Sequence, residues 1–352
     1  MRALTFRGER TIALETVSDP RIERATDAVV RVELAAICGS DLHVYHARER
    51  GLDRGTVMGH EFVGEVVECG PDVAGLAPGD RVLSPFTTSC GGCFYCREGL
   101  TARCESGQLF GWVQGGHGLH GAQAEYVRVP LAASTLVPIP EGLSDDDALL
   151  AGDVASTGLF CARGAGVHSG GTYVVLGCGP VGLAAVAGAL ALGAETLFAA
   201  DTVPGRLAHA ERLGARGLDL RTESIVETIR AATDGRGADA VLEAAGTPEA
   251  TRLALDLVRP GGTVSAVAVH AEERFPFSPV EAYDKNLTYR TGRCPARSLL
   301  SDVIPLLSSG RYDLASMISH RLPLERGVEG YDIFDRKADG CMKVVLLPAS
   351  TR

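Results

Sequence analysis

The stretch Tyr173-Val174-Val175-Leu176-Gly177-Cys178-Gly179-Pro180-Val181-Gly182 decides the fold of this chain. An uninterrupted apolar run of this length is typical of a buried parallel strand, and the Ala-rich residues 181–192 that follow indicate a helix. The first glycine allows a tight turn, the second lets the backbone approach a pyrophosphate, and the third allows the helix to pack closely on the strand. The segment therefore predicts a dinucleotide-binding strand–turn–helix unit.

An acidic residue stands where such a unit needs one. The next apolar run, residues 196–200, leads into Asp201, roughly 20 residues beyond the turn. A carboxylate there accepts hydrogen bonds from the adenosine ribose hydroxyls and repels a 2′-phosphate, so we expect NAD rather than NADP. Arg206 is the competing signal, because an arginine nearby can bind a 2′-phosphate. With Asp201 present, we expect Arg206 to lie along the ribose.

The rest of the chain divides into two patterns. Strand-like runs at 240–243 and 263–267 alternate with a helix over 206–213, which predicts a doubly wound parallel sheet. Residues 1 to about 150 instead show period-two alternation at 29–34 and 64–70, separated by Gly-Pro and Pro-Gly turns. That pattern predicts a partly open β-barrel. Helices are expected over 145–162, with Ser144 as N-cap, and over 299–308, with a final strand at 343–347.

Composition excludes several classes of protein. A chain of 352 residues suggests about two domains. Its net charge of −10 argues against nucleic acid or an anionic membrane as the main partner. The longest apolar run, residues 181–192, is shorter than the ~20 residues that cross a membrane, and no secretory signal precedes the first strand. We therefore expect a cytoplasmic enzyme.

Four of the ten cysteines lie within fifteen residues, namely Cys90, Cys93, Cys96 and Cys104. In a cytoplasmic chain such a cluster indicates a metal site rather than disulfides. Four thiolates with no open position predict a structural zinc ion. Reduced bystander thiols and an iron–sulfur cluster are the alternatives, and nothing else in the chain suggests electron-transfer partners.

A second set of metal-binding residue types is dispersed. Cys38 lies in Cys-Gly-Ser-Asp-Leu-His, and His60 and Glu61 lie in Gly-His-Glu-Phe-Val-Gly-Glu. A single cysteine or histidine is usually structural, and the spacing alone does not show that Cys38 and His60 meet.

These motifs, together with Ser156-Thr157-Gly158, resemble those of the zinc-containing medium-chain alcohol dehydrogenases in order and spacing over essentially the whole chain. The Gly-Ala-Gln-Ala-Glu-Tyr-Val stretch and Asp153 look most like the formaldehyde-dehydrogenase-like and bacterial secondary-alcohol branches. The resemblance implies an α/β protein with a GroES-like catalytic domain over 1–154, completed by 294–352. A Rossmann NAD-binding domain would occupy 155–293.

The resemblance also implies a catalytic zinc ion held by Cys38, His60 and Asp153, so that two zinc ions are expected per chain. Glu61 matches a glutamate that can approach this metal. Asp41 and Glu65 match positions that orient the ligands.

Further roles follow from the same resemblance. Ser40 matches the hydroxyl that hydrogen-bonds the substrate alcohol, and His43 matches the distal end of a proton relay that passes through the cofactor ribose. Lys343 matches a basic residue near the pyrophosphate. The expected cofactor-binding residues are Thr157, Gly177, Gly179, Pro180, Val181, Gly182, Asp201, Arg206, Val267, Val269 and Lys343.

The implied reaction is hydride transfer between a primary or secondary alcohol and NAD, giving an aldehyde or ketone. A polyol or sugar dehydrogenase is the alternative, although those members often carry glutamate as the third ligand. A catalytically inactive NAD-binding relative is disfavoured, because Cys38, His60, Asp153 and Ser40 are all present. We expect a homotetramer or homodimer joined through the Rossmann sheet, with residues 264–269 as its exposed edge.

Overall fold

The computed structural model describes residues 1–348 and divides the chain into two compact units. The first unit comprises Met1–Asp153, Pro295–Ser308 and the chain from Ala315; the second comprises Val154–Cys294 and Ser309–Leu314. The sequence-based boundaries at 154/155 and 293/294 lie one residue from these divisions. They place residues 309–314 with the first unit instead of the second.

The second unit is built on a six-stranded parallel sheet with the strand order β12-β11-β10-β13-β14-β15. This is the doubly wound order, with β10 and β13 at the point where the direction of winding reverses. The strands are β10 (Thr172–Leu176), β11 (Thr196–Asp201), β12 (Arg216–Asp219), β13 (Ala238–Glu243), β14 (Val258–Ala266) and β15 (Thr288–Thr291).

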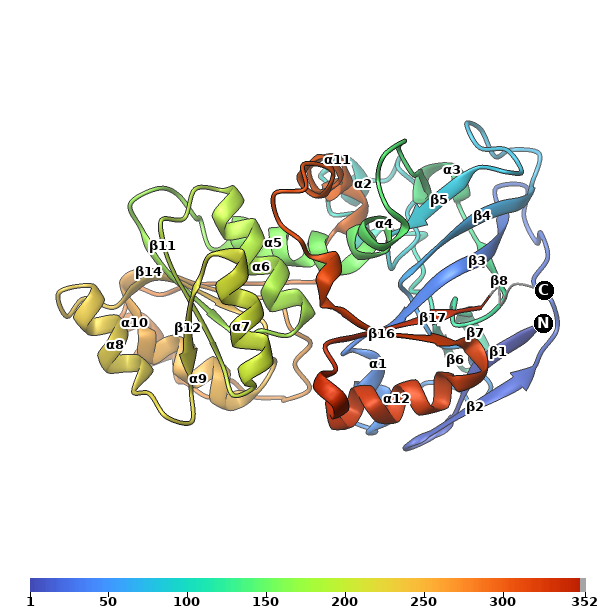
Figure 1. Cartoon of the computed structure of the whole chain (residues 1–352). Helices are drawn as coiled ribbons and strands as arrows, with labels where there is room; N and C mark the ends of the chain where they lie inside the picture. Colours follow the sequence, from blue (N-terminus) through green and yellow to red (C-terminus); the bar gives the residue numbers. More distant parts are fainter. Residues whose placement is uncertain (349–352) are drawn as a thin grey trace. The chain divides into compact units, whose positions relative to one another are not determined.

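Helices cover both faces of this sheet. α6 contacts both α5 and α7, α8 contacts α9, and Figure 1 shows the two groups on opposite sides of the strands. Apolar side chains such as Val174, Phe198, Val241 and Val264 fill the core between sheet and helices. The helices of this unit are α5 (Ser156–Gly164), α6 (Pro180–Ala191), α7 (Pro204–Leu213), α8 (Ile225–Ala232), α9 (Pro248–Leu257) and α10 (Pro279–Asp284).

The expectation that residues 264–269 form an exposed sheet edge is wrong. They include the end of β14, which lies between β13 and β15. The edge on this side is β15, within the part of the chain that the structure describes. Its sequence, Thr-Tyr-Arg-Thr, is mostly polar and contains no apolar run that would predict a buried strand.

The first unit is built on a mainly antiparallel sheet with the order β16-β17-β3-β4-β5-β9, in which β8 also pairs with β3. Figure 1 shows the C-terminal strands in red beside the blue β3, so the last part of the chain completes the sheet begun by the first. The strands are β3 (Ala28–Ile37), β4 (Phe62–Cys69), β5 (Arg81–Ser84), β8 (Tyr126–Val129), β9 (Val137–Pro138), β16 (Ile318–Pro323) and β17 (Lys343–Leu347).

Two hairpins and several short helices complete this unit. The hairpins are β1 (Arg2–Gly8) with β2 (Thr11–Thr16), and β6 (Trp112–Gln114) with β7 (His117–Leu119). The helices are α1 (Asp41–Tyr45), α2 (Phe94–Arg97), α3 (Ala132–Thr135), α4 (Asp145–Leu150), α11 (Ala296–Ser308) and α12 (Gly327–Arg336). Single 3-10 turns are η1 (Thr101–Arg103), η3 (Ala315–Met317), η4 (Leu324–Arg326) and η5 (Ala338–Gly340).

The helix expected over 145–162 begins as predicted but changes its winding. The Ser144 hydroxyl accepts the Asp147 N–H at 3.1 Å and caps α4. After Leu150 the chain forms a π-helical turn, η2 (Ala151–Ala155), before α5 begins. A π turn inside a helix often marks a functional position. Within residues 1–348, no helix is both long and apolar enough to cross a membrane.

Candidate active site

Four potential metal ligands converge in the first unit. The Cys38 thiol, the His60 ring and the carboxylates of Glu61 and Asp153 each offer a ligand atom, and these atoms all lie within 4.8 Å of one another. Asp153 Oδ2 is 3.8 Å from Cys38 Sγ and 3.4 Å from His60 Nε2. The structure thus brings together residues whose proximity the sequence could not show.

Strand pairing explains why two of the three chain segments meet. Cys38 follows the end of β3, and His60-Glu61 immediately precede β4. The two strands are antiparallel, with Ala35 opposite Phe62, so the end of one lies beside the start of the other. A backbone hydrogen bond of 3.0 Å from Ala36 N–H to the Glu61 carbonyl extends the ladder to the ligands.

The third segment reaches the cluster through the π turn η2. Gly152 precedes Asp153, and a Cβ at Gly152 would lie 2.2 Å from the Ser84 carbonyl oxygen at the end of β5. No side chain fits there, so the glycine lets the turn approach the strand closely. Asp153 is thereby held next to Cys38 and His60.

The Asp41 carboxylate connects two of the ligands. Its Oδ2 accepts the Cys38 backbone N–H at 2.9 Å, and its Oδ1 faces His60 Nδ1 at 3.4 Å. This leaves Nε2 as the His60 nitrogen that points at the other ligands. Glu65, expected in a similar orienting role, instead binds Arg31 at 2.7 Å and lies away from the cluster. That expectation is wrong, because Glu65 is inside β4, where the strand carries it away from the end that bears His60.

A buried ion pair adjoins the cluster. Lys343 Nζ lies 2.6 Å from the Glu61 carboxylate, and the two side chains are 1% and 0% exposed. Burial is the largest single influence and lowers the pKa of Lys343, but the charge and hydrogen bond of Glu61, together with Cys38 and Asp153, raise it more, so the pKa stands above its usual value. The family resemblance implied a place for Lys343 near the cofactor pyrophosphate. The structure shows its ammonium on Glu61, and a role in cofactor binding stays a prediction.

The donor set fits a zinc ion. Burial raises the pKa of the Cys38 thiol, and the Glu61 charge adds to this effect. Three buried carboxylates, those of Asp41, Glu61 and Asp153, lie around Cys38 and His60, and Lys343 supplies one buried ammonium, which leaves an excess of buried negative charge. A divalent cation would balance that charge and favour the thiolate, and zinc accepts sulfur, imidazole and carboxylate ligands together.

The cysteine lobe forms a second, separate cluster. The ligand atoms of Cys90, Cys93, Cys96 and Cys104 lie within 4.8 Å of one another. Backbone hydrogen bonds from Glu105 and Cys96 lower the pKa of Cys93 to about 6, whereas burial raises the pKa of Cys96 to about 12. A metal ion would hold all four as thiolates, and four sulfur ligands close a tetrahedral structural site.

In the second unit the glycine-rich turn has the expected form. It joins β10 to α6, whose first residue is Pro180, and the first-turn N–H groups there can bind phosphate. A Cβ at Gly182 would lie 1.7 Å from the Gly177 carbonyl oxygen, so only glycine allows this helix-to-strand contact. The turn therefore has the shape that a dinucleotide requires.

Asp201 ends β11 beside this turn. Its Oδ2 accepts the Cys178 N–H at 2.7 Å, and its Oδ1 accepts the N–H groups of Thr202 and Val203 at 2.7 and 2.9 Å. These bonds fix the carboxylate at the carboxyl end of the strand. Arg206 Nη1 lies 3.8 Å from Asp201 Oδ2, and the same nitrogen lies 3.8 Å from the position that a Cβ at Gly179 would occupy.

Apart from Lys343, which is in the first unit, the other expected cofactor residues lie in the second unit. Thr157 is buried in the first turn of α5, and Val267 and Val269 follow the carboxyl end of β14. Carboxyl ends of neighbouring parallel strands share one sheet edge, so Val267 and Asp201 occupy the same side of the unit.

The sequence reading missed Glu243, which ends the apolar strand β13. Its fully buried carboxylate accepts the N–H groups of Ala245 and Gly246 at 2.8 and 2.7 Å, and it lies 3.1 Å from His270 Nε2. These contacts shape the turn after β13 and tie it to the segment after β14. The signal available in the sequence was an acidic residue, Glu243, directly after the apolar run of this strand.

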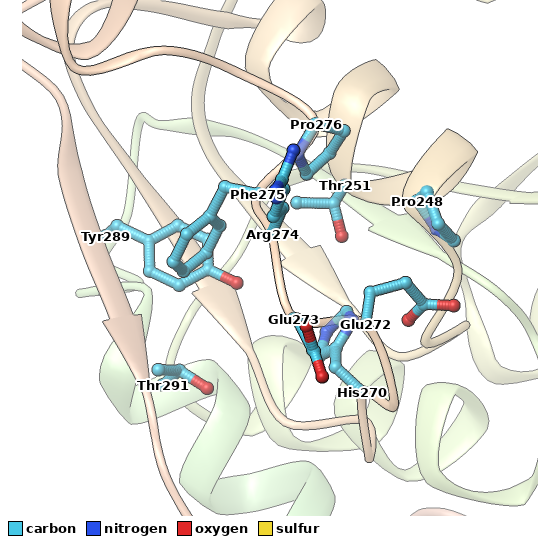
Figure 2. Close-up of a pocket in the computed structure, with 10 residues that line it drawn as sticks. All are labelled: Pro248, Thr251, His270, Glu272, Glu273, Arg274, Phe275, Pro276, Tyr289 and Thr291. Carbon is cyan, nitrogen blue, oxygen red and sulfur yellow. The ribbon is translucent and has the colours of Figure 1, made fainter. Parts of the chain in front are cut away.

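A pocket lies beside this segment. Figure 2 shows Phe275 and Tyr289 together on one side and His270 with the acidic Glu272 and Glu273 on the other. The two aromatic rings are 5.2 Å apart in an edge-on arrangement. The Glu243 carboxylate raises the pKa of His270, so a positive charge on its ring is favoured.

Comparison with known proteins assigns the family. Residues 24–141 match the alcohol dehydrogenase GroES-like domain, and residues 180–309 match the zinc-binding dehydrogenase domain. The chain is 43% identical to a zinc-type alcohol dehydrogenase B of Aspergillus flavus, over 95% of this chain and 79% of that protein. The chain belongs to the zinc-type alcohol dehydrogenases.

Two further proteins show how far the likeness extends. A medium chain reductase/dehydrogenase of an Acremonium species is 47% identical over 81% of this zinc-type alcohol dehydrogenase and 98% of its own length. The structure of the alcohol dehydrogenase TADH from Thermus sp. ATN1 is similar with a TM-score of 0.92, 42% identity and 99% of both chains covered. The expected fold class, a GroES-like domain with a Rossmann-type parallel sheet, is confirmed.

The buried ion pair gives a testable consequence for stability. Lys343→Met should destabilise the protein by about 3–5 kcal/mol, because it leaves the Glu61 charge buried without a partner. Arg336→Met removes one partner of the exposed pair with Asp332 and should cost at most about 1 kcal/mol. Urea unfolding of the zinc-loaded protein measures both. Equal small effects would show that the Lys343–Glu61 pair adds no stability.

Proposed function

We propose that this zinc-type alcohol dehydrogenase transfers hydride between a primary or secondary alcohol and NAD, giving an aldehyde or ketone. The observation that carries the proposal is the convergence of the half-buried Cys38 with the buried His60 and Asp153 in the first unit. The glycine-rich turn with Asp201 in the second unit supports the cofactor.

The residues around the ligands suggest how the alcohol loses its proton. A zinc ion held by Cys38, His60 and Asp153 would act as a Lewis acid that makes a substrate hydroxyl more acidic. Ser40 Oγ lies 3.3 Å from His60 Nε2, within reach of a hydroxyl placed among the ligands. We propose that Ser40, the N-cap of α1, accepts the proton at this oxygen and that His43, in the first turn of α1, passes it towards solvent.

Two other nearby groups that could take this proton, Glu61 and His46, are engaged elsewhere. The carboxylate of Glu61 is paired with Lys343, and His46 Nε2 lies 2.6 Å from Asp335 Oδ1. These contacts favour the route through Ser40. A polyol substrate remains the second candidate, and the aspartate at position 153 disfavours it.

We further propose a homodimer or homotetramer in the cytoplasm. One of the two edges of the sheet in the second unit is β15, and the segment leading to it bears exposed apolar side chains. Phe275, Val280 and Tyr283 are 59%, 66% and 82% exposed. A second copy pairing along β15 would cover them, as apolar patches of this kind usually mark contact surfaces.

Zinc content tests the two-site assignment. Carefully prepared protein should contain two zinc ions per chain. Cys38→Ser should leave a folded protein with one zinc ion and little alcohol oxidation. Cys93→Ser should impair folding, since a structural zinc contributes folding free energy directly. Metal analysis, circular dichroism and NAD reduction measure these outcomes, and one zinc ion or none in the unaltered protein would contradict the proposal.

Cofactor preference tests the role of Asp201. We expect kcat/KM for NAD to exceed that for NADP by about tenfold or more, corresponding to about 1.4 kcal/mol for one unfavourable contact. Asp201→Ala should narrow the difference, because Arg206 could then bind a 2′-phosphate. Steady-state kinetics with both cofactors measure the ratio. A preference of the unaltered enzyme for NADP would overturn the assignment.

Paired substitutions test the proton route. Ser40→Ala should lower kcat by about 10³–10⁴-fold and His43→Ala by about 10²-fold or less, because solvent or buffer can replace a distal proton acceptor. Amine buffers should restore part of the His43→Ala activity and leave Ser40→Ala unchanged. Equal losses that no buffer relieves would mean that the proton leaves by another path.

A further inference from the structure

A buried amide stands behind the proposed zinc ligands. Gln123 is 0% exposed and lies shortly before β8. Its Nε2 donates to the Ala36 carbonyl at 3.1 Å and to Asp41 Oδ2 at 3.2 Å. Its Oε1 accepts the hydroxyl hydrogen of Tyr331 at 2.8 Å. Gln123 therefore connects the C-terminal helix α12 with Asp41.

The Tyr331 hydroxyl determines which way this amide points. A glutamine amide donates at one end and accepts at the other, and the two ends have nearly the same shape. Ala36 and Asp41 both present acceptors, so the NH₂ end must face them. The Tyr331 O–H supplies the donor that the opposite end needs. In the reverse orientation the amide oxygen would face a carboxylate and a carbonyl in a buried site, which is unfavourable.

Tyr331 is itself held rigidly. Its side chain is 1% exposed, and its ring packs against Tyr45 of α1 with centroids 5.8 Å apart. The hydroxyl therefore cannot turn to solvent, and Gln123 Oε1 is the partner it meets. A residue near the end of the chain is thus fixed against the segment that carries Asp41.

Asp41 passes this constraint to two ligands at once. Its Oδ2 receives both the Gln123 amide and the Cys38 backbone N–H, while its Oδ1 faces the Nδ1 of His60. Loss of the Gln123 bond would leave Oδ2 with one donor and allow the carboxylate to rotate. Rotation would move the His60 ring, because that ring is oriented through Nδ1.

We propose that Gln123 and Tyr331 are positioning residues for the catalytic zinc ion, acting through Asp41 on His60 and Cys38. The proposal rests on the assignment of Cys38 and His60 as ligands made above. Neither residue touches the reacting atoms. Their effect should appear in how firmly and in what geometry the metal is held.

The experiment uses the full-length, zinc-loaded protein and three substitutions. Gln123→Met removes both ends of the amide at nearly constant shape, and Tyr331→Phe removes the hydroxyl alone. Tyr173→Phe is the matched control in the second unit: Tyr173 is 1% exposed, and its hydroxyl bonds the backbone N–H and carbonyl of His168 at 2.9 and 3.0 Å. All three lose a buried hydrogen bond, but only the first two affect Asp41.

Three measurements separate positioning from general stability. The first is the rate at which a chelator removes each zinc ion, with the zinc of the four-cysteine lobe as internal reference. The second is the visible d–d spectrum after cobalt replaces the catalytic zinc ion, which reports ligand geometry. The third is kcat beside KM for NAD.

Gln123→Met should speed loss of the catalytic zinc ion by about tenfold or more, the range seen when outer hydrogen-bond partners of metal ligands are removed. Tyr331→Phe should have a smaller effect in the same direction, and combining it with Gln123→Met should add nothing further. Both variants should shift the cobalt spectrum and lower kcat with little change in KM for NAD. Tyr173→Phe should lower the unfolding midpoint and leave the rate of zinc release and the cobalt spectrum unchanged.

The proposal is overturned if Tyr331→Phe folds and behaves like Tyr173→Phe, with unchanged zinc release and cobalt spectrum. If Gln123→Met does not fold, Tyr331→Phe alone decides by the same measurements. Failure of the underlying site assignment would look different. In that case the unaltered protein would release no zinc ion besides that of the four-cysteine lobe.

Discussion

The ladder of β17, β3 and β4 is the constraint on which the proposed metal site depends. Antiparallel pairing of β3 with β4 places Cys38 beside His60 and Glu61, and pairing of β17 with β3 sets Val344 opposite Ile37. Lys343 consequently arrives next to Glu61. Three segments separated by long stretches of chain meet because backbone hydrogen bonds specify their register. A slip of one residue would turn these side chains to the other face of the sheet.

The buried carboxylates that the ladder brings together need partners that compensate for their charge. Burying a carboxylate is costly unless a cation or several hydrogen bonds compensate for its charge. Glu61 is compensated by Lys343, and Asp41 by the Cys38 N–H, the Gln123 amide and its contact with His60. Asp153 adds further negative charge to the same volume, and the Cys38 thiol would add more on losing its proton to become a metal ligand. A divalent cation would compensate this charge, so we expect folding and metal binding to be coupled here.

In the second unit, backbone groups rather than basic side chains are positioned to bind a phosphate-bearing cofactor. Its turn offers backbone N–H groups at the start of α6, and Gly182 lets helix and strand approach. Asp201 and Glu243 each accept backbone N–H groups at the carboxyl ends of their strands. In both cases a buried carboxylate shapes a turn at the sheet edge where doubly wound folds bind ligands.

The sequence by itself determined the local features. Residues 173–182 specify a strand, turn and helix through their own composition, and four closely spaced cysteines predict a metal lobe because few residues separate them. Family resemblance then predicted Cys38, His60 and Asp153, which the fold brings together. Only the tertiary structure decided that Glu65 lies outside the site, that β15 is the sheet edge, and that Lys343 is paired with Glu61. It alone revealed Gln123 and Tyr331 behind Asp41. These facts depend on strand register and on contacts between residues up to 282 positions apart in the chain. Local spacing carries no information about either, since both are set only when the chain packs.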